Sequence, residues 1–401
     1  MRRDKYKIFS EGKIGALTVP NRLLRSATWD PSILATRQMT DEVLHLYEQL
    51  ALGGVGLIIT GDFSVVPEGM FDAGTDQEAF AYDAVKITGF AGLSEVVHRA
   101  APRCKIVAQV SGEYWGVDPS DVPSPFTEER TRPLSTEEIQ VIIGCFVETI
   151  AHVRDEGFDG VQLHAAHGGL LSRFLSPYSN RRTDEYGGSA RNRARIVTEV
   201  VRQAKEQVGD FPILIKMNGT DYVEGGTDVA TFPKLAEEIA RAGVDAIEIS
   251  GGMWDCLVRT EEELGFRPVP SPESHTRIKH PDEQSYFLEY AKSLDLGIPI
   301  ILVGGNRDVE ILEEIVRRGK VDFIALCRPL ISEPDLPNRW LAGQGSSGTD
   351  CISCNSCIYN MIVHPGRDEP GVATCLFKHD KQQHRVAQQW LASWVKENVI
   401  T

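Results

Sequence analysis

The chain has 401 residues, of which 42% are apolar and 25% charged, an ordinary balance for a globular protein and a length that is long for one domain. Its net charge of −15 argues against a general nucleic-acid surface, because phosphate binding needs clustered Lys and Arg, and it disfavours attraction to anionic membranes. No apolar run approaches the roughly 20 residues of a membrane helix, so no membrane partner is expected.

The start of the chain and its cysteines favour a cytoplasmic protein. Met1–Lys7 is charged and has no apolar segment behind it, so we expect no secretory signal. The eight cysteines are too sparse to suggest a disulfide framework, and a reducing compartment fits them better. A homo-oligomer is one option for the assembly.

Short apolar strands alternate with helical segments along the first half of the chain. In order, the pattern predicts a strand at 19–29, helix 41–52, strand 56–61, helix 85–101, strand 105–110, a Pro-rich loop 117–135, a helix from 136 to about 156, and strand 160–166. Ser135 or Thr136 can cap the helix that follows the loop, because glutamates come next.

The second half repeats the alternation. It predicts a helix at 189–208 capped by Ser189, strand 212–218, helix 228–242, strand 246–252, an insertion at 253–283, helix 284–294, strand 299–306, helix 308–318 and strand 322–329.

Eight strands alternating with helices over about 330 residues favour an α/β fold, a (β/α)8 TIM barrel. A doubly wound sheet is the structural alternative, but no Gly-x-Gly-x-x-Gly turn follows the first strand. We expect residues 1–345 to form the barrel. Residues 346–401, after a Gly/Ser-rich linker, would form a short cysteine-bearing extension that packs on the barrel or on a partner subunit.

Polar residues follow the strands at their carboxyl ends, the face where barrel enzymes hold their active sites. Singly, each fits a capped strand end or a solvated loop, but together they predict one site: Thr28, Gln109, His164, His167, Lys216, Asn306 and Arg328.

The last two strands carry a phosphate-binding pattern. Gly304 and Gly305 let backbone N–H groups approach an anion, and Cys327-Arg328 adds charge and a forked donor. A tight turn explains the two glycines alone, whereas the glycines together with Arg328 favour a phosphate.

His164 and His167 can grip an oxygen that gains negative charge during a reaction. A zinc site would need a third ligand, and no companion carboxylate stands out at a strand end. Two structural histidines are the remaining alternative.

The longest motif resembles the signature of the old yellow enzyme family of NAD(P)H:flavin oxidoreductases. It runs His164-x-x-His167-Gly-x-Leu-x-x-x-Phe-Leu-Ser-Pro-x-x-Asn180-x-Arg-x-Asp184-x-Tyr186-Gly-Gly-Ser189-x-x-Asn192-Arg193. The resemblance covers roughly residues 5–340, with Pro20-Asn-Arg22 and Arg328-Pro-Leu among the matching segments. It implies a barrel that binds FMN at the strand ends and takes electrons from NAD(P)H.

The same resemblance implies roles for individual residues. Ala27, Thr28 and Trp29 would lie beside the isoalloxazine, as would Gly61 or Asp62, and Gln109 would bond its pyrimidine edge. Lys216 would stabilise the reduced flavin near N1, and Gly304, Gly305, Cys327 and Arg328 would hold the phosphate. His164 and His167 would bind the carbonyl oxygen of an enone, so that hydride from flavin N5 reaches its β carbon.

One position departs from the family pattern. Related enzymes often have Tyr two residues after the second histidine as the proton donor, and here that place is Gly169. Hydride delivery does not need the phenol, but protonation must come from water or another acid. Tyr114, Tyr178 and Tyr222 are candidates.

The cysteine tail resembles the iron–sulfur ligand run of larger relatives. Cys351, Cys354 and Cys357 are followed by Cys375, but the third spacing and the long final gap depart from that pattern. Those relatives continue into a nucleotide-binding domain, and this sequence ends at Thr401. We expect free thiols without a metal, with a 4Fe-4S cluster or zinc as the alternatives.

Three hypotheses follow. The first is an FMN-dependent ene-reductase that uses NAD(P)H and an enone in turn. The second is a flavin-dependent oxidase or dehydrogenase, for instance in demethylation or desaturation. The third is a catalytically weakened flavin-binding protein that uses its cysteine tail for interactions.

Overall fold

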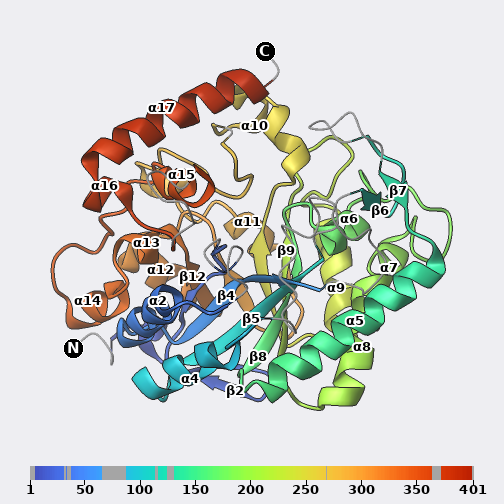
Figure 1. Ribbon diagram of the computed structural model, residues 1–401, viewed down its shortest axis with the longest axis horizontal. Coiled ribbons are helices and arrows are strands. Elements are labelled where there is room, and N and C mark those ends of the chain that lie inside the picture. Colours follow the sequence, from blue (N-terminus) through green and yellow to red (C-terminus); the bar gives the residue numbers. More distant parts are fainter. Residues whose placement is uncertain are drawn as a thin grey trace.

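Eight parallel strands close into a barrel in the computed structural model, which describes residues 5–30, 33, 38–65, 87–112, 116–123, 131–267, 269–363 and 372–399. The strand order around the barrel follows the chain, as in Figure 1. The strands are β3 (Leu23–Arg25), β4 (Leu57–Ser64), β5 (Lys105–Ser111), β8 (Gly160–Ala165), β9 (Ile213–Asn218), β10 (Ala246–Ser250), β11 (Ile300–Leu302) and β12 (Phe323–Leu326). The predicted (β/α)8 barrel is confirmed.

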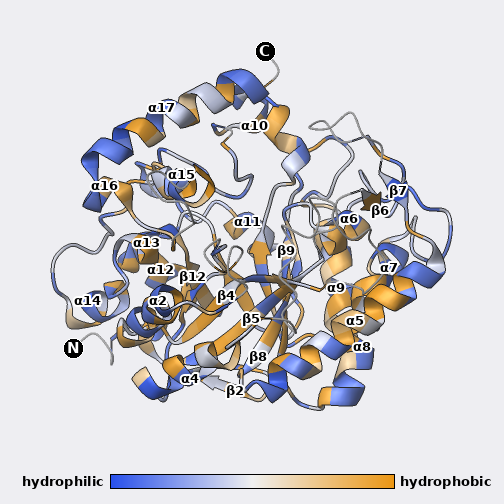
Figure 2. Cartoon of the chain, in the orientation of Figure 1, coloured by the Kyte–Doolittle hydropathy of each residue, from blue (hydrophilic) through white to orange (hydrophobic). Residues whose placement is uncertain are grey.

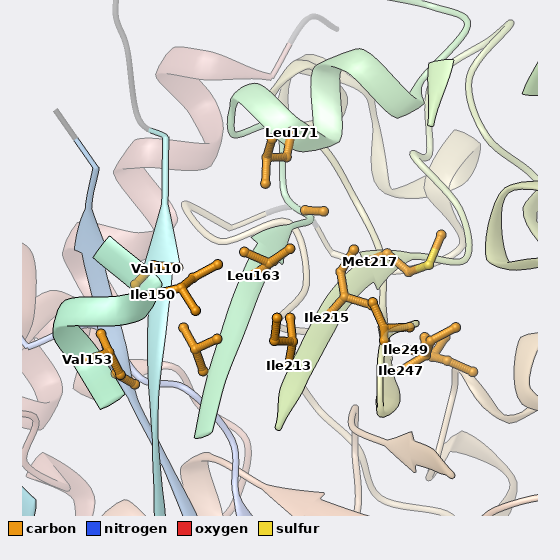
Figure 3. Close-up of a cluster of buried hydrophobic side chains, with 14 of the residues drawn as sticks. Val110, Ile150, Val153, Leu163, Leu171, Ile213, Ile215, Met217, Ile247 and Ile249 are labelled. Atoms are coloured by element: carbon orange, nitrogen blue, oxygen red, sulfur yellow. The ribbon is translucent and has the colours of Figure 1, made fainter. Parts of the chain in front are cut away.

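Helices surround the barrel with their apolar sides inward (Figure 2). The longer ones that follow strands are α2 (Asp41–Leu52), α4 (Ala91–Ala100), α5 (Thr136–Asp155), α8 (Arg195–Val208), α9 (Phe232–Ala242), α11 (Leu288–Lys292) and α12 (Val309–Arg317). Figure 3 shows the layer between them: Leu163 and Ile213 from the strands lie near Ile150 of α5 and Leu171 of α6 (Leu170–Leu175). Burial of such faces is what stabilises the helices, because isolated helices of this length are marginal.

The bottom of the barrel is closed by a hairpin that the sequence pattern did not predict. Strands β1 (Gly12–Ile14) and β2 (Leu17–Val19) pair antiparallel, and Ile14 and Val19 join the interior cluster of the barrel with Leu57 and Phe323. The interior is therefore a packed core, and the open space lies at the carboxyl ends of the strands.

The predicted helix caps are confirmed, but several of the predicted helix bounds are wrong. Ser135 caps α5 in a reciprocal capping box with Glu138, and Ser189 caps α7 (Ala190–Arg193). The helix expected at 189–208 is interrupted at Ala194, so that α7 and α8 are separate. Residues 85 and 86, where another helix was expected to start, lie outside the described residues.

Two other expected helices are shorter than predicted. The one expected at 228–242 starts only at Phe232, because Asp228 accepts backbone bonds from Ala230 and Thr231 in a turn. The one expected at 284–294 starts at Leu288, since Ser285 has a φ of 52° that no helix continues through.

The loops and the tail cover the carboxyl face. The insertion holds η3 (Trp254–Val258), α10 (Glu261–Leu264) and η4 (Pro281–Glu283). Beyond α13 (Arg328–Ser332) and α14 (Leu336–Ala342), the tail forms α15 (Ser356–Val363), α16 (Leu376–His379) and α17 (Lys381–Asn398). Figure 1 shows α15 and α17, in red, near the insertion, and Trp394 of α17 packs against Leu257 and Leu264.

Within the described ranges, every helix is too short or too polar to cross a lipid bilayer.

Candidate active site

A cavity of about 500 Å³ opens at the carboxyl ends of the strands. This volume lies within the range of roughly 300–1,000 Å³ that is usual for ligand sites. All but one of the residues predicted for the catalytic and cofactor site line it: Ala27, Thr28, Trp29, Gln109, His164, His167, Lys216, Gly304, Gly305, Cys327 and Arg328. Their roles stay predictions, but the chain does bring them to one place.

The exception is Gly61, which does not line the cavity, whereas its neighbour Asp62 does. A Cβ at Gly61 would come within 2.7 Å of the backbone oxygen of Thr28. Glycine there lets the end of β4 pack against the segment that follows β3. Asp62 accepts a hydrogen bond of 2.9 Å from Ser111 Oγ.

The two histidines sit next to each other where β8 ends, with ring centroids 5.0 Å apart. His167 has a φ of 61°, and its backbone N–H donates to Asn218 Oδ1 at 3.2 Å. Its Nε2 lies 2.7 Å from Ser250 Oγ. The next two strands, β9 and β10, thus fix His167, whereas His164 Nδ1 is buried and has no hydrogen-bond partner among the described residues.

Both imidazoles are held neutral. Burial, followed by His167 and Lys216, lowers the pKa of His164 to about 3, and burial and Lys216 lower the pKa of His167 well below its usual range. A neutral imidazole offers one N–H donor and one acceptor. Two such rings can donate to a ligand oxygen without carrying a charge of their own.

The opposite end of the cavity is a cradle suited to an anion. Gly304 and Gly305 have φ values of 101° and 72°, and a Cβ on either would lie 2.6 or 2.8 Å from the ring of Tyr286. Half-buried Arg328 donates from Nη1 to the His275 carbonyl at 2.7 Å and to Asn355 Oδ1 at 2.6 Å. Arg307 also lines the cavity. We had not predicted Arg307, although it directly follows Gly304-Gly305-Asn306 in the sequence.

A chain of buried polar side chains lies beneath the cavity. Ser26, Gln109, Gln162, Lys216 and Glu248 are all 4% exposed or less. Of these, we had not predicted Ser26, Gln162 or Glu248. The signal for the last two was a polar residue inside an apolar strand, as in Ala246-Ile-Glu-Ile.

The insertion and the tail supply a second group of lining residues that the sequence pattern did not reveal. Trp254 and Glu273 come from the insertion, and Ile358 and Met361 come from α15. Their segments carry no motif, so only the fold could bring them to the strand ends.

Of the candidate proton donors, neither Tyr178 nor Tyr222 lines the cavity, and Tyr114 lies outside the described residues. Tyr178 lies near Asp255, whose charge acts on it, and Tyr222 packs against Phe266. The tyrosine that does line the cavity is Tyr286, whose OH donates to the Glu273 carbonyl at 2.7 Å. Burial raises its pKa to about 12.

The tail cysteines are unpaired thiols close to the anion cradle. Burial, followed by the neighbouring Cys351, raises the pKa of Cys357, which lines the cavity. Across the described ranges, no group of three or more His, Cys, Asp or Glu side chains is arranged to hold a metal ion.

The lining residues fit FMN. The glycine cradle with Arg307 and Arg328 suits a phosphate, Lys216 and Gln109 suit the polar edge of a flavin ring, and the free His164 Nδ1 lacks a partner that a bound molecule would supply.

Comparison with known proteins gives a consistent result. The model of the NADH:flavin oxidoreductase / NADH oxidase family matches residues 7–345. The NADH oxidase of Thermoanaerobacter brockii is 32% identical over 367 residues, covering 88% of this chain and 54% of the relative. The NADPH dehydrogenase of Bacillus subtilis (strain 168) is 31% identical over 339 residues, covering 82% of this chain and 92% of the relative.

Solved structures agree on the fold. A 2-naphthoyl-CoA reductase superimposes with a TM-score of 0.77 at 22% identity, covering 97% of this chain and 58% of that one. Morphinone reductase superimposes with a TM-score of 0.64 at 22% identity, covering 86% of this chain and 93% of that one. The chain spans about half the length of the first curated relatives, 54% and 53%.

Proposed function

The chain belongs to the NADH:flavin oxidoreductase / NADH oxidase family, and we propose that it is an FMN enzyme that passes electrons from NAD(P)H to an activated C=C bond. The observation that carries this proposal is the pair of neutral histidines, buried His164 and half-buried His167, in the wall of a cavity that also contains an anion cradle.

FMN would supply hydride transfer between NAD(P)H and the substrate. Gly304, Gly305 and Arg328 would hold its phosphate, and Gln109 and Lys216 would contact the polar edge of its ring. A cation beside that edge favours the negative charge that reduction adds, because opposite charges attract strongly where water is excluded.

His164 and His167 bind the carbonyl oxygen of the substrate. Each donates one N–H, and the negative charge that builds on this oxygen as hydride arrives strengthens both hydrogen bonds. Ser250 and Asn218 fix His167 in advance, so little reorganisation is needed. With Gly169 in place of a tyrosine, the proton for the α carbon comes from water that enters the cavity.

The first test is spectroscopic. The purified protein is expected to be yellow, to release FMN on denaturation, to bleach anaerobically with NADH or NADPH, and to regain its colour on addition of cyclohexenone. A colourless protein that releases no FMN would contradict the proposal.

A second candidate is oxidation of an amine. Asp62 and Glu273 both line the cavity, and both favour positive charge at His164. Two carboxylates facing the substrate would suit a cation. Bleaching of the flavin by an amine without NAD(P)H, and no reoxidation by an enone, would favour this candidate.

A further inference from the structure

Glu248 is a fully buried carboxylate at the middle of β10, with 0% of its side chain exposed. Three donors surround it. Ser26 Oγ donates to its Oε1 at 2.6 Å, Gln162 Nε2 donates to its Oε2 at 2.8 Å, and Lys216 Nζ lies 3.4 Å from Oε1. Lys216 also donates to Ser26 Oγ at 3.0 Å. Lys216, which lines the cavity, therefore has the buried carboxylate of Glu248 as its ion-pair partner.

The carboxylate also dictates the direction of the next hydrogen bonds, because an ionised carboxylate can only accept. Gln162 must turn its Nε2 toward Glu248, so its Oε1 faces Gln109. Gln109 must then donate its own Nε2, which it does at 2.7 Å. With its Nε2 turned to Gln162, Gln109, which lines the cavity, keeps its Oε1, a pure acceptor, free of the relay.

An acceptor at this place matches the flavin. The pyrimidine edge carries one donor, N3–H, between two carbonyl acceptors. If Gln109 were turned over, its NH2 would meet N3–H donor to donor, an arrangement that leaves buried polar groups unpaired.

We infer that Glu248 is the positioning residue of the FMN site: it holds Lys216 in place, offsets part of its charge, and through Gln162 sets which end of the Gln109 amide meets the cofactor. The inference rests on the proposed placement of Lys216 and Gln109 beside FMN. It adds a residue that touches neither the cofactor nor the substrate yet sets the reduction potential of the flavin.

Glu248→Gln tests the inference, because it removes the charge and keeps the shape. Lys216 then acts on the flavin unopposed, so reduced FMN is expected to gain about tenfold in binding relative to oxidised FMN, which is a midpoint potential about 30 mV more positive. The substitution also places an N–H donor where the carboxylate had an acceptor oxygen, so one of the three surrounding donors loses its partner. Oxidised FMN is therefore expected to bind about tenfold more weakly. Glu248→Asp keeps the charge and is expected to leave the potential near that of the unchanged protein.

The matched control is Glu313→Gln. Glu313 is also buried and accepts backbone bonds from Lys7 and Ile8, at 2.8 and 2.9 Å, but these partners do not line the cavity, unlike Ser26 and Lys216 beside Glu248. This variant is expected to lose stability without any change in the potential of FMN. A potential in Glu248→Gln equal to that in Glu313→Gln would overturn the inference.

If Glu248→Gln does not fold, Gln162→Met tests the relay from its middle. It leaves the Lys216–Glu248 pair intact and frees Gln109 to turn, so FMN is expected to bind about tenfold more weakly. Unchanged FMN binding would overturn the relay.

Both readouts, the midpoint potential and the affinity for FMN, are independent of turnover. A shifted potential in a protein that reduces no enone would therefore refute the proposed function alone, and an unshifted potential in an active enzyme would refute this inference alone.

Discussion

At the scale of single residues, the site depends on positions that tolerate little change. Gly304 and Gly319 both have left-handed backbone, with φ values of 101° and 81°. A Cβ at Gly304 would meet the ring of Tyr286 at 2.6 Å, whereas a Cβ at Gly319 would meet nothing within 4 Å. The two glycines therefore share the backbone strain of a substitution and differ in the contacts of the added Cβ, which at Gly304 would meet Tyr286 of the cavity wall and buried Phe287.

Comparing Gly304→Ala with Gly319→Ala should therefore separate the effect of backbone strain from an effect on FMN binding. Both should lose about 1–2 kcal/mol of stability from left-handed backbone. Only Gly304→Ala should also bind FMN at least about tenfold more weakly, because Tyr286 is pushed from the cradle. FMN fluorescence titrations measure this, and equal affinities in the two variants would show that the glycine pair does not hold the phosphate.

The buried histidine predicts how stability depends on pH. The pKa of His164 is lowered to about 3 in the folded protein, against about 6.5 when unfolded, so below about pH 6.5 the unfolded chain binds the extra proton. Stability is therefore fully present above this range and is lost as pH falls. From pH 7 to pH 5 this one residue should cost about 2 kcal/mol.

Urea unfolding at the two pH values checks this prediction. His164→Gln should lose about 2 kcal/mol less than the unchanged protein on going from pH 7 to pH 5. The same substitution at exposed His45, where 68% of the side chain is accessible, should leave the pH dependence as it was. An identical pH dependence in His164→Gln would contradict a neutral, buried imidazole.

At the scale of elements, the tail helix α15 forms one wall of the cavity through Ile358 and Met361. Asn355, just before this helix, connects it to the barrel: its Oδ1 accepts from Arg328 Nη1 at 2.6 Å and its Nδ2 donates to the Ser274 carbonyl at 2.9 Å. We therefore propose that the extension is part of the site rather than an appendage.

Asn355→Gly removes this connection without backbone strain, because glycine tolerates its φ of 58°. Loss of a hydrogen bond to a half-buried guanidinium should cost about 2 kcal/mol of unfolding free energy and should weaken FMN binding. Arg277→Gly is the control, since exposed Arg277 has a φ of 59° and no bond to Arg328. Thermal unfolding and FMN titration that fail to distinguish the two variants would refute the role of Asn355.

The sequence pattern identified the barrel strands because each is an apolar run between turn signals. It missed the hairpin β1–β2, whose strands have only three residues each, and it overextended β11, which ends at Leu302. Strand-end residues such as Gln109 and Lys216 could be predicted, since parallel strands bring their carboxyl ends together. Trp254 and Met361 could not, because their contact with the site depends on loop paths that no motif records. Glu248 was marked only as a polar residue inside an apolar strand, and its partners come from strand register in the fold.

At the scale of the whole molecule, the (β/α)8 barrel is confirmed, and the chain's membership of the NADH:flavin oxidoreductase / NADH oxidase family supports the proposed FMN cofactor and NAD(P)H donor. A cytoplasmic location and a homo-oligomer stay predictions. Three features of this chain bear on the chemistry of its cavity: the glycine at position 169, the acidic side chains Asp62 and Glu273, and the tail residues that line it.

The most direct measurement mixes anaerobically reduced protein with cyclohexenone and follows the return of flavin colour. Mixing oxidised protein with NAD(P)H follows the other half of the cycle. In His164→Ala, loss of one donor to the substrate oxygen should slow reoxidation by the enone about 10²-fold. Reduction by NAD(P)H should change only a few-fold, because no negative charge builds on the carboxamide oxygen of the nicotinamide as hydride leaves the ring. Reoxidation at the unchanged rate, or an equal loss in both half-reactions, would contradict the role of the histidine pair.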